Sequence, residues 1–332
     1  MVRVAGALFV LAGLCAAQTP EFGKDARRVR PLECEVAVPE GWKVDQDHTG
    51  LVARDAKDNG FLLSREPMLR DPKDFAAAWT AQLASGGRVV KVETKRVGRG
   101  TAWRAAWTSD AAGGRSIEIW RVHAPENEML YNFSFTAEAS FPIEALVDGV
   151  LKGFKCTAEK PELRFQRTGE TVTNRITLTL PEGYAREPAR FGGLGGGLSA
   201  AFILPLPGYP EPHFAGRIET FQINPRAGIP TPDGYVAGTD TEGVLEAFWT
   251  NSSKDLEVTK KPRTKGGRFG GLKGDTLEAE VRTKDGVPKV FFGFCGKHKQ
   301  EVLLVTILVD ERELRLHKNY FKDVLGQLDV RD

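Results

Sequence analysis

Cysteines, excess charge of one sign and long apolar runs are all scarce in this chain of 332 residues. Four cysteines are too few for a small disulfide-dense scaffold. The formal net charge of +2 is too small to argue for nucleic acid or for strong attraction to a membrane. No run of apolar residues reaches the ~20 that a transmembrane helix needs. The sequence therefore predicts neither a nucleic-acid partner nor a transmembrane segment.

Catalytic motifs are also missing. The glycine-rich stretches Gly192–Gly197 and Lys265–Gly274 fit neither G-x-G-x-x-G nor the phosphate-binding P-loop, and both are expected to be loops or bends. Ser199 lacks the second glycine of a nucleophile elbow. Cys295 and His298 have a metal-like spacing, yet one pair is half a site at best. We expect no catalytic residue, no cofactor and no metal, and hence no enzyme.

The N-terminus has the pattern of a targeting segment. Arg3 supplies a positive charge, Val4 to Leu14 is an apolar core too short to span a bilayer, and small residues precede a cleavage site after Ala17. Residues 1–17 are therefore expected to be a signal peptide, and residues 18–30 a polar leader. The alternative is a lipoprotein anchored through Cys15, although the preceding leucine is a poor residue for that signal. The sequence predicts export to a periplasmic or extracellular space.

Export changes the interpretation of the remaining cysteines, Cys34, Cys156 and Cys295. An oxidising compartment permits a disulfide, and three cysteines allow at most one within the chain. Cys34 lies in the first strand of the first half, and Cys156 follows its last helix. A bond between Cys34 and Cys156 would tie the ends of one domain together. Cys295 is then expected to be a buried, inert thiol.

One phrase occurs twice. A strand-like run ends in Pro39-Glu40-Gly41-Trp42, and another ends in Pro181-Glu182-Gly183-Tyr184. The chain is therefore interpreted as two copies of one domain, residues 31–157 and 167–330, joined by a linker at 158–166.

The order of expected elements is the same in both copies. A helix carries Trp79 in the first copy and Trp249 in the second, and both tryptophans are expected in the core. Asp71 is expected to cap the first of these helices, and Thr239 with Glu242 to form a capping box on the second. Four strands and a closing helix follow in each copy. The expected strands are Val89–Val97, Thr101–Thr108, Ser116–His123 and Met129–Thr136, then Leu256–Arg263, Thr276–Arg282, Pro288–Cys295 and Glu301–Val309. The last helix of the chain is expected to begin at the capping pair Asp310 and Glu313.

The second copy is longer near its start. Trp79 follows Pro39 by 40 positions, whereas Trp249 follows Pro181 by 68, which leaves about 28 extra residues in the second copy. They fall in an insertion at about 185–235. Long loops on a rigid frame often carry function.

These patterns, from the repeated Pro-Glu-Gly-aromatic phrase to the closing helices that end at Phe154 and Leu328, resemble the PsbP-like superfamily, which includes the periplasmic DcrB-like proteins. The resemblance extends over nearly the whole chain after residue 17, once per repeat. It implies an α+β fold of two tandem antiparallel sheets with helices packed on them. It also implies work by contact with other proteins, and it supplies no catalytic residue.

A basic hairpin recurs in both copies. Its candidate partner-binding residues are Lys95, Arg96 and Arg99 in the first copy and Lys260, Lys261, Arg263, Lys265 and Arg268 in the second. One interpretation is a solvated edge on which lysines discourage aggregation. The other is a docking surface for an acidic partner, which would be sensitive to salt.

The sequence thus favours an exported, non-enzymatic accessory or scaffold protein that binds another protein at the cell envelope. The alternative is a small-molecule or lipid-binding protein with a cleft near the 185–235 insertion. An enzyme of unrecognised class is the third hypothesis.

Overall fold

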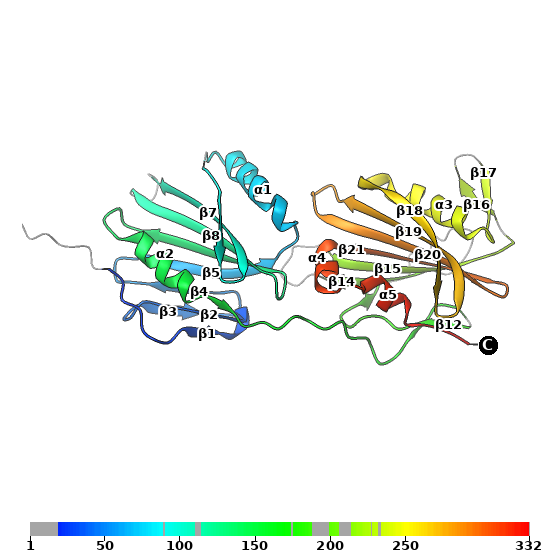
Figure 1. Cartoon of the computed structure of the whole chain (residues 1–332), viewed down its shortest axis with the longest axis horizontal. Helices are drawn as coiled ribbons and strands as arrows, with labels where there is room; N and C mark the ends of the chain where they lie inside the picture. Colours follow the sequence, from blue (N-terminus) through cyan, green and yellow to red (C-terminus); the bar gives the residue numbers. More distant parts are fainter. Residues whose placement is uncertain are drawn as a thin grey trace, which may run out of the picture. The chain divides into compact units, whose positions relative to one another are not determined.

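The computed structural model of the chain is drawn in Figure 1. The residues that it describes are 19–88, 90–109, 114–173, 175–187, 199–205, 214–226, 228–231 and 234–331. The expected signal peptide with Cys15 lies outside these residues, as do Gly192–Gly197 and His213. Within the described residues, no helix is long and apolar enough to cross a membrane.

The chain divides into two compact units. Unit 1 consists of Met1–Arg65, Ala76–Pro125 and Leu130–Ala158. Unit 2 consists of Glu66–Phe75, Glu126–Met129 and Glu159–Asp332. Each is described by itself below.

The first large sheet has seven strands in the order β3-β4-β5-β9-β8-β7-β6. Its strands are β3 (Lys43–Gln46), β4 (Gly50–Arg54), β5 (Gly60–Pro67), β6 (Glu93–Val97), β7 (Gly100–Ser109), β8 (Arg115–Ala124) and β9 (Met129–Ala137). Helix α1 (Pro72–Ser85) follows β5, and α2 (Ile143–Lys152) follows β9. As expected, the Asp71 carboxylate accepts a hydrogen bond from the Lys73 N–H (2.9 Å) at the start of α1, and Trp79 is buried.

The second large sheet repeats this order as β13-β14-β15-β21-β20-β19-β18. Its strands are β13 (Ala185–Arg186), β14 (Ser199–Pro205), β15 (Phe214–Ile223), β18 (Glu257–Phe269), β19 (Leu272–Arg282), β20 (Pro288–His298) and β21 (Glu301–Asp310). Three helices accompany it: α3 (Thr241–Ser252), α4 (Glu311–Leu316) and α5 (Tyr320–Leu325). The shared strand order confirms the predicted α+β fold with two copies of an antiparallel sheet.

Each copy also has a small three-stranded sheet. In the first, β2 (Cys34–Val36) pairs with β1 (Arg27–Val29) and β10 (Lys155–Cys156). In the second, β12 (Ile176–Leu178) pairs with β11 (Glu170–Thr171) and β22 (Leu328–Val330). Short 3₁₀ turns occur at Arg30–Leu32 and Ser253–Asp255.

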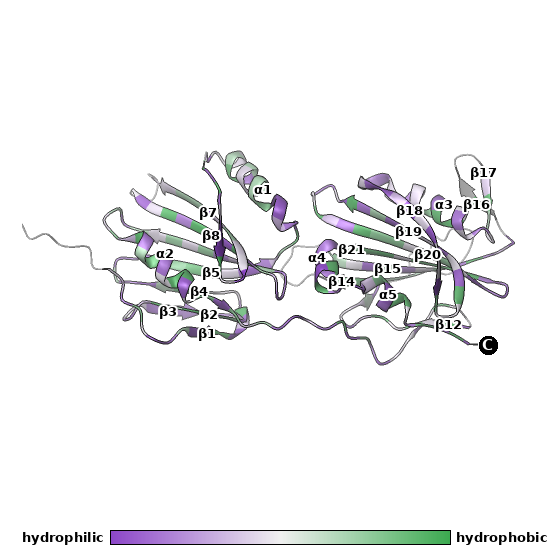
Figure 2. Ribbon diagram, viewed as in Figure 1, coloured by the Kyte–Doolittle hydropathy of each residue, from purple (hydrophilic) through white to green (hydrophobic). Residues whose placement is uncertain are grey.

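The central strands of the second sheet are buried on both faces. One side of β20 and β21, which includes Phe292 and Val305, packs with Tyr320 and Leu325 of α5. The other side, which includes Phe291, packs with the buried Trp249 of α3. Successive side chains of a strand point to opposite faces, so burial of both faces accounts for the unbroken apolar run Val302–Val305. Hydrophobic and hydrophilic stretches alternate along other strands (Figure 2).

Three sequence-based expectations about local structure are wrong. The N-cap of α3 is Asp240, whose carboxylate accepts from the Gly243 N–H, and not Thr239. The closing helix does begin directly after Asp310, its N-cap residue, but it is split into α4 and α5, and Asp310 makes no side-chain capping bond. The stretch Lys265–Gly274 is mostly strand, because β18 and β19 continue to a tight turn at Gly270-Gly271.

The 185–235 insertion is not simply a loop. Strands β14 and β15 occupy the sheet positions of β4 and β5 in the first copy. Among its described residues, the second copy adds the small hairpin of β16 (Gly228–Thr231) and β17 (Gly234–Ala237), before α3. Its strands β14 and β15 are also each two residues longer than β4 and β5.

The Gly270-Gly271 turn gives a matched pair of substitutions. Both glycines have positive φ, at +53° and +83°, as a two-residue turn between paired strands requires. A Cβ on Gly270 would lie 2.4 Å from the Leu328 carbonyl oxygen, whereas a Cβ on Gly271 would meet nothing within 4 Å. We expect Gly271→Ala to lower the free energy of unfolding by about 1 kcal/mol, and Gly270→Ala by about 2 to 4 kcal/mol. If urea denaturation shows that both variants lose the same free energy of unfolding, the close approach of Gly270 to Leu328 does not add to the cost.

Candidate functional site

The basic residues of the second copy lie together on the last strand of its sheet. β18 pairs only with β19 in the strand order, so it forms an edge, and residues 257–266 are all exposed. Lys260, Lys261, Arg263 and Lys265 fall within this exposed part, and Arg268 follows near the turn.

The pairing of β18 with β19 is irregular at these residues. Val258 lies opposite Val281, Lys260 opposite Glu280 and Arg263 opposite Glu278. From Val258 to Arg263 is five steps along β18, while Val281 to Glu278 is three steps along β19, so β18 contains two extra residues. A β-bulge bends a strand and redirects its side chains, and bulges are frequent at sheet edges and beside active sites.

A surface hollow of about 290 Å³ lies at this irregularity. Its lining is Lys260, Lys261, Arg263, Thr264, Lys265, Glu278, Ala279 and Glu280. Lys260 forms an ion pair with Glu280 (Nζ–Oε1, 2.5 Å). Among the described residues, Lys261, Arg263 and Lys265 make no ion pair, so the hollow has an excess of positive charge.

The corresponding residues of the first copy are arranged differently. Lys95 and Arg96 lie on β6, the edge strand of the first sheet, and Arg99 lies in the turn that follows. The β6–β7 pairing runs without a register shift from Glu93 to Val97. The Lys95 ammonium lies 5.3 Å from the centroid of the Trp120 ring. The two hairpins are therefore equivalent in topology but not in local structure, and partner binding by either stays a prediction.

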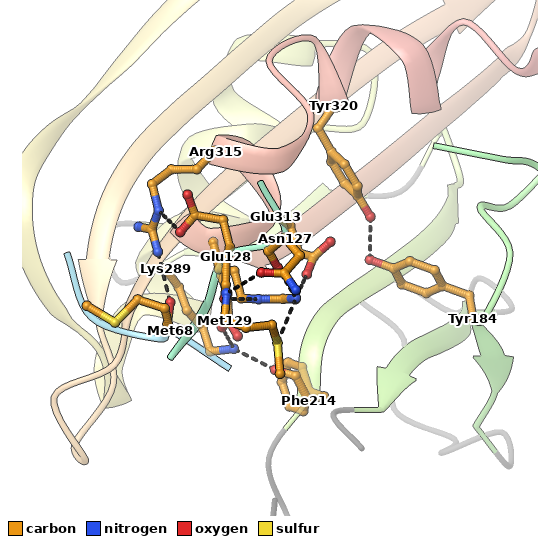
Figure 3. Close-up of polar contacts among 12 residues, drawn as sticks. Met68, Asn127, Glu128, Met129, Tyr184, Phe214, Lys289, Glu313, Arg315 and Tyr320 are labelled. Atoms are coloured by element: carbon orange, nitrogen blue, oxygen red, sulfur yellow. Dashed lines mark hydrogen bonds and ion pairs between the residues drawn. The ribbon is translucent and has the colours of Figure 1, made fainter. Parts of the chain in front are cut away.

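A second group of charged residues lies where α4 begins (Figure 3). The Lys289 ammonium contacts Asp310 Oδ1 at 2.5 Å and donates to the Phe214 carbonyl oxygen at 2.8 Å. The Lys289 side chain is 7% exposed and the Asp310 side chain 1%. This pairing explains why Asp310 does not cap α4: its carboxylate is the counter-charge of a buried lysine.

Two arginines of α4 bind other segments of unit 2 (Figure 3). Arg315 pairs with the Glu128 carboxylate (2.8 Å) and donates to the Met68 carbonyl oxygen (2.9 Å). Arg312 donates to the Glu128 and Asn127 carbonyl oxygens and forms an ion pair with Glu313. Burial raises the pKa of Glu313, and Arg312 opposes that rise. Such mutual pairing is typical of a structural network that holds segments 66–75 and 126–129 in unit 2.

Two buried tyrosines bridge the repeated phrase and α5. The Tyr184 and Tyr320 hydroxyls lie 2.7 Å apart, and Figure 3 shows the two rings pointing toward one another. Burial is the main cause that raises the pKa of both phenols above the usual range. Both hydroxyls therefore stay protonated at neutral pH. Their hydrogen bond satisfies two polar groups that are buried in the hydrophobic core.

The cysteines at the ends of the first copy are neighbours. Cys34 on β2 lies directly opposite Cys156 on β10. The adjacent pair, Glu33 and Thr157, is hydrogen-bonded (2.8 Å), so Cys34 and Cys156 occupy a non-hydrogen-bonded position, where side chains approach most closely. Both are free thiols in the structure, and the bond between them stays a prediction. Burial, with Cys156 as a smaller cause, raises the pKa of Cys34 to about 12.

The structure also shows the surroundings of Cys295, the remaining cysteine singled out from the sequence. Cys295 is buried, and burial raises its pKa to about 12, as expected for an inert thiol. Within the described part of the chain, no three His, Cys, Asp or Glu side chains form a group that could hold a metal ion. The hollow on β18 was not predicted from the sequence, although Pro262 within a strand run is a signal for an edge or a bulge.

A second hollow, of about 480 Å³, lies near the β4–β5 turn and is lined by Lys43, Arg54, Asp55 and Asp58 among others. Neither hollow is lined by a described residue of the 185–235 insertion. The ligand cleft suggested for that insertion stays a prediction.

Comparisons with known proteins give similarities of structure only. No protein family and no curated protein matches the sequence. Among solved structures, the PsbP protein of the cyanobacterium Synechocystis is 16% identical, with a TM-score of 0.34 over 51% of this chain and 94% of its own. LpqN of Mycobacterium tuberculosis, titled as involved in cell envelope biogenesis, is 11% identical, with a TM-score of 0.32 over 52% of this chain and 91% of its own. The Ran-binding protein Mog1p of Saccharomyces cerevisiae is 12% identical, with a TM-score of 0.30 over 52% of this chain and 97% of its own. With TM-scores below 0.5, these similarities identify no function for this chain.

Proposed function

We propose that this chain is an exported, non-enzymatic accessory protein of two tandem PsbP-like domains, of the DcrB-like kind, that binds an acidic protein at the cell envelope. The observation that carries the proposal is a group of cations on the edge strand β18 that form no ion pair with any described residue. Lys261, Arg263 and Lys265 are exposed around one hollow, and their charge is not neutralised by ion pairs with described residues.

Export is supported by the N-terminal pattern of residues 1–17. Cleavage after Ala17 would release the chain, and lipidation at Cys15 would instead anchor it. Mass spectrometry of the mature protein from its own host distinguishes these outcomes by the mass of its first peptide. An unprocessed N-terminus would contradict export.

Binding by exposed charges should depend strongly on salt. The screening length falls from about 10 Å at 0.1 M salt to about 3 Å at 1 M. We expect the mature chain to recover a specific protein from its own envelope extract at the lower concentration and to release it at the higher one. The variant Lys261→Gln/Arg263→Gln/Lys265→Gln/Arg268→Gln should recover at least about tenfold less, since each exposed pair contributes up to about 1 kcal/mol.

A matched control removes the same charge from exposed positions off the hairpins. Its four substitutions are Lys24→Gln, Arg28→Gln, Lys318→Gln and Lys322→Gln. We expect this control to recover the protein as the unaltered chain does. Equal losses in both variants would mean that net charge alone attracts the protein, and no loss in either would exclude β18 as the docking surface.

A further inference from the structure

The irregular pairing of β18 has a specific geometry. Only Ala279 lies between Glu278 and Glu280 on β19, while both Lys261 and Pro262 lie between their partners on β18. Two residues that oppose one define a β-bulge. Without Pro262, Lys260 and Arg263 would still face Glu280 and Glu278, and the register shift between Val258 and Lys260 would be the one that remains. The bulge therefore changes the local course of β18 but does not determine which residues of β18 and β19 pair.

Strand addition by a partner is disfavoured at this edge. Lysines, proline and bulges are the devices by which edge strands resist pairing with another chain, and β18 contains Pro262 and several lysines. Pro262 also has no N–H to donate to an added strand. A partner would therefore be recognised through side chains, in the hollow, and not through the backbone of β18.

The lining of the hollow fits small anionic groups. Its volume of about 290 Å³ is at the lower limit of ligand pockets, about 300 Å³. Lys260 is paired with Glu280, which leaves three cations, Lys261, Arg263 and Lys265, against the single carboxylate of Glu278. A guanidinium can bind a carboxylate through two parallel hydrogen bonds, and ammonium groups add charge beside it.

We infer that the bulge at Lys261-Pro262 forms a binding site for the carboxylate side chains of an extended acidic segment of the partner protein. This inference rests on the proposed function and deepens it, because it makes the shape of the hollow, and not only its charge, a determinant of binding. Arg263 binds one carboxylate, while Lys261 and Lys265 flank it.

The test uses the full mature chain and a hexaglutamate peptide, with binding measured by isothermal titration calorimetry at low salt. Deleting Pro262 removes the bulge and keeps every charge, and Thr264→Trp fills the hollow with a neutral side chain. We expect each variant to bind the peptide about tenfold more weakly, as does Lys261→Gln/Arg263→Gln/Lys265→Gln. The matched control is Thr250→Trp, at an exposed position of α3 that does not line the hollow, and it should bind normally.

The outcomes separate the inference from the proposed function. If the three-glutamine variant loses binding while the Pro262 deletion and Thr264→Trp keep it, charge alone acts: the inference falls and the proposed function stands. If the three-glutamine variant binds normally, both fall. The assignment of carboxylates as the ligand is overturned if the unaltered chain does not bind hexaglutamate. It is also overturned if the unaltered chain binds inorganic phosphate more tightly than hexaglutamate. Neither result bears on the proposed function. A thermal unfolding transition in each variant establishes that the variant is folded. If the Pro262 deletion variant is not folded, the binding of Thr264→Trp tests whether the shape of the hollow matters.

Discussion

Asp310→Ala is expected to lower the free energy of unfolding of unit 2 by about 3 to 5 kcal/mol. The substitution removes the counter-charge of Lys289, whose side chain is only 7% exposed. A buried ammonium without its partner is far more costly than the pair is favourable, because the charge has lost its hydration as well. Since Asp310 makes no side-chain capping hydrogen bond to α4, the loss does not report on a helix cap. Urea denaturation followed by circular dichroism measures it.

Two controls test this explanation. Asp255→Ala breaks the ion pair with Lys284, in which both side chains are largely exposed, and should leave stability almost unchanged. Lys289→Met combined with Asp310→Leu removes both buried charges and should cost less than Asp310→Ala alone. If the double variant is the less stable of the two, burial of an unpaired charge is not the cause.

Oxidation of Cys34 and Cys156 to a disulfide is expected to raise the midpoint of thermal unfolding of unit 1 by about 10 °C. The bond would join β2 to β10 and close a long loop that spans almost the whole first copy. In the chain-entropy account, a loop of that size stabilises by up to about 5 kcal/mol through its effect on the unfolded chain. Scanning calorimetry with and without reductant measures the difference.

The chemistry of Cys34 sets the rate of that oxidation. Its pKa of about 12 leaves very little thiolate at neutral pH, and the thiolate is the reacting form. We therefore expect bond formation in the folded chain to be slow at pH 7 and faster as pH rises. Cys34→Ser/Cys156→Ser should show no effect of reductant, whereas Cys295→Ser should behave as the unaltered chain. A stable bond found by peptide mapping without any rise in the midpoint would contradict the prediction.

Most of the architecture could be predicted from the sequence because it depends on local patterns. The alternation of apolar residues in Met129–Thr136 predicted β9, and the apolar stripes of the helices placed Trp79 and Trp249 in the core. Helix ends were less predictable. Asp310 resembles a capping residue in sequence, but Lys289, 21 positions earlier, takes its carboxylate.

The candidate site was only partly predictable for the same reason. The charges of β18 are visible in the sequence, whereas the bulge depends on how Lys261 and Pro262 align with Ala279, which no local pattern specifies. Similarly, the contacts of Arg312 and Arg315 join residues more than 180 positions apart. The glycines of Lys265–Gly274 suggested a long loop, yet most of this stretch is paired strand. Within it, Gly270 and Gly271 are the glycines that adopt positive φ, and the others have ordinary strand conformations.

In each copy, the second strand along the chain is hydrogen-bonded both to the strand that opens the copy and to the strand that closes it. Cys34 of β2 pairs with Cys156 of β10, and Ile176 of β12 pairs with Val330 of β22. The chain therefore enters and leaves each copy at the same small sheet, far along the sequence but adjacent in space. A module with adjacent ends can be duplicated in series, inserted into a host loop or circularly permuted without breaking its large sheet. This arrangement gives a physical reason why a gene for one such module could be extended to two by simple duplication.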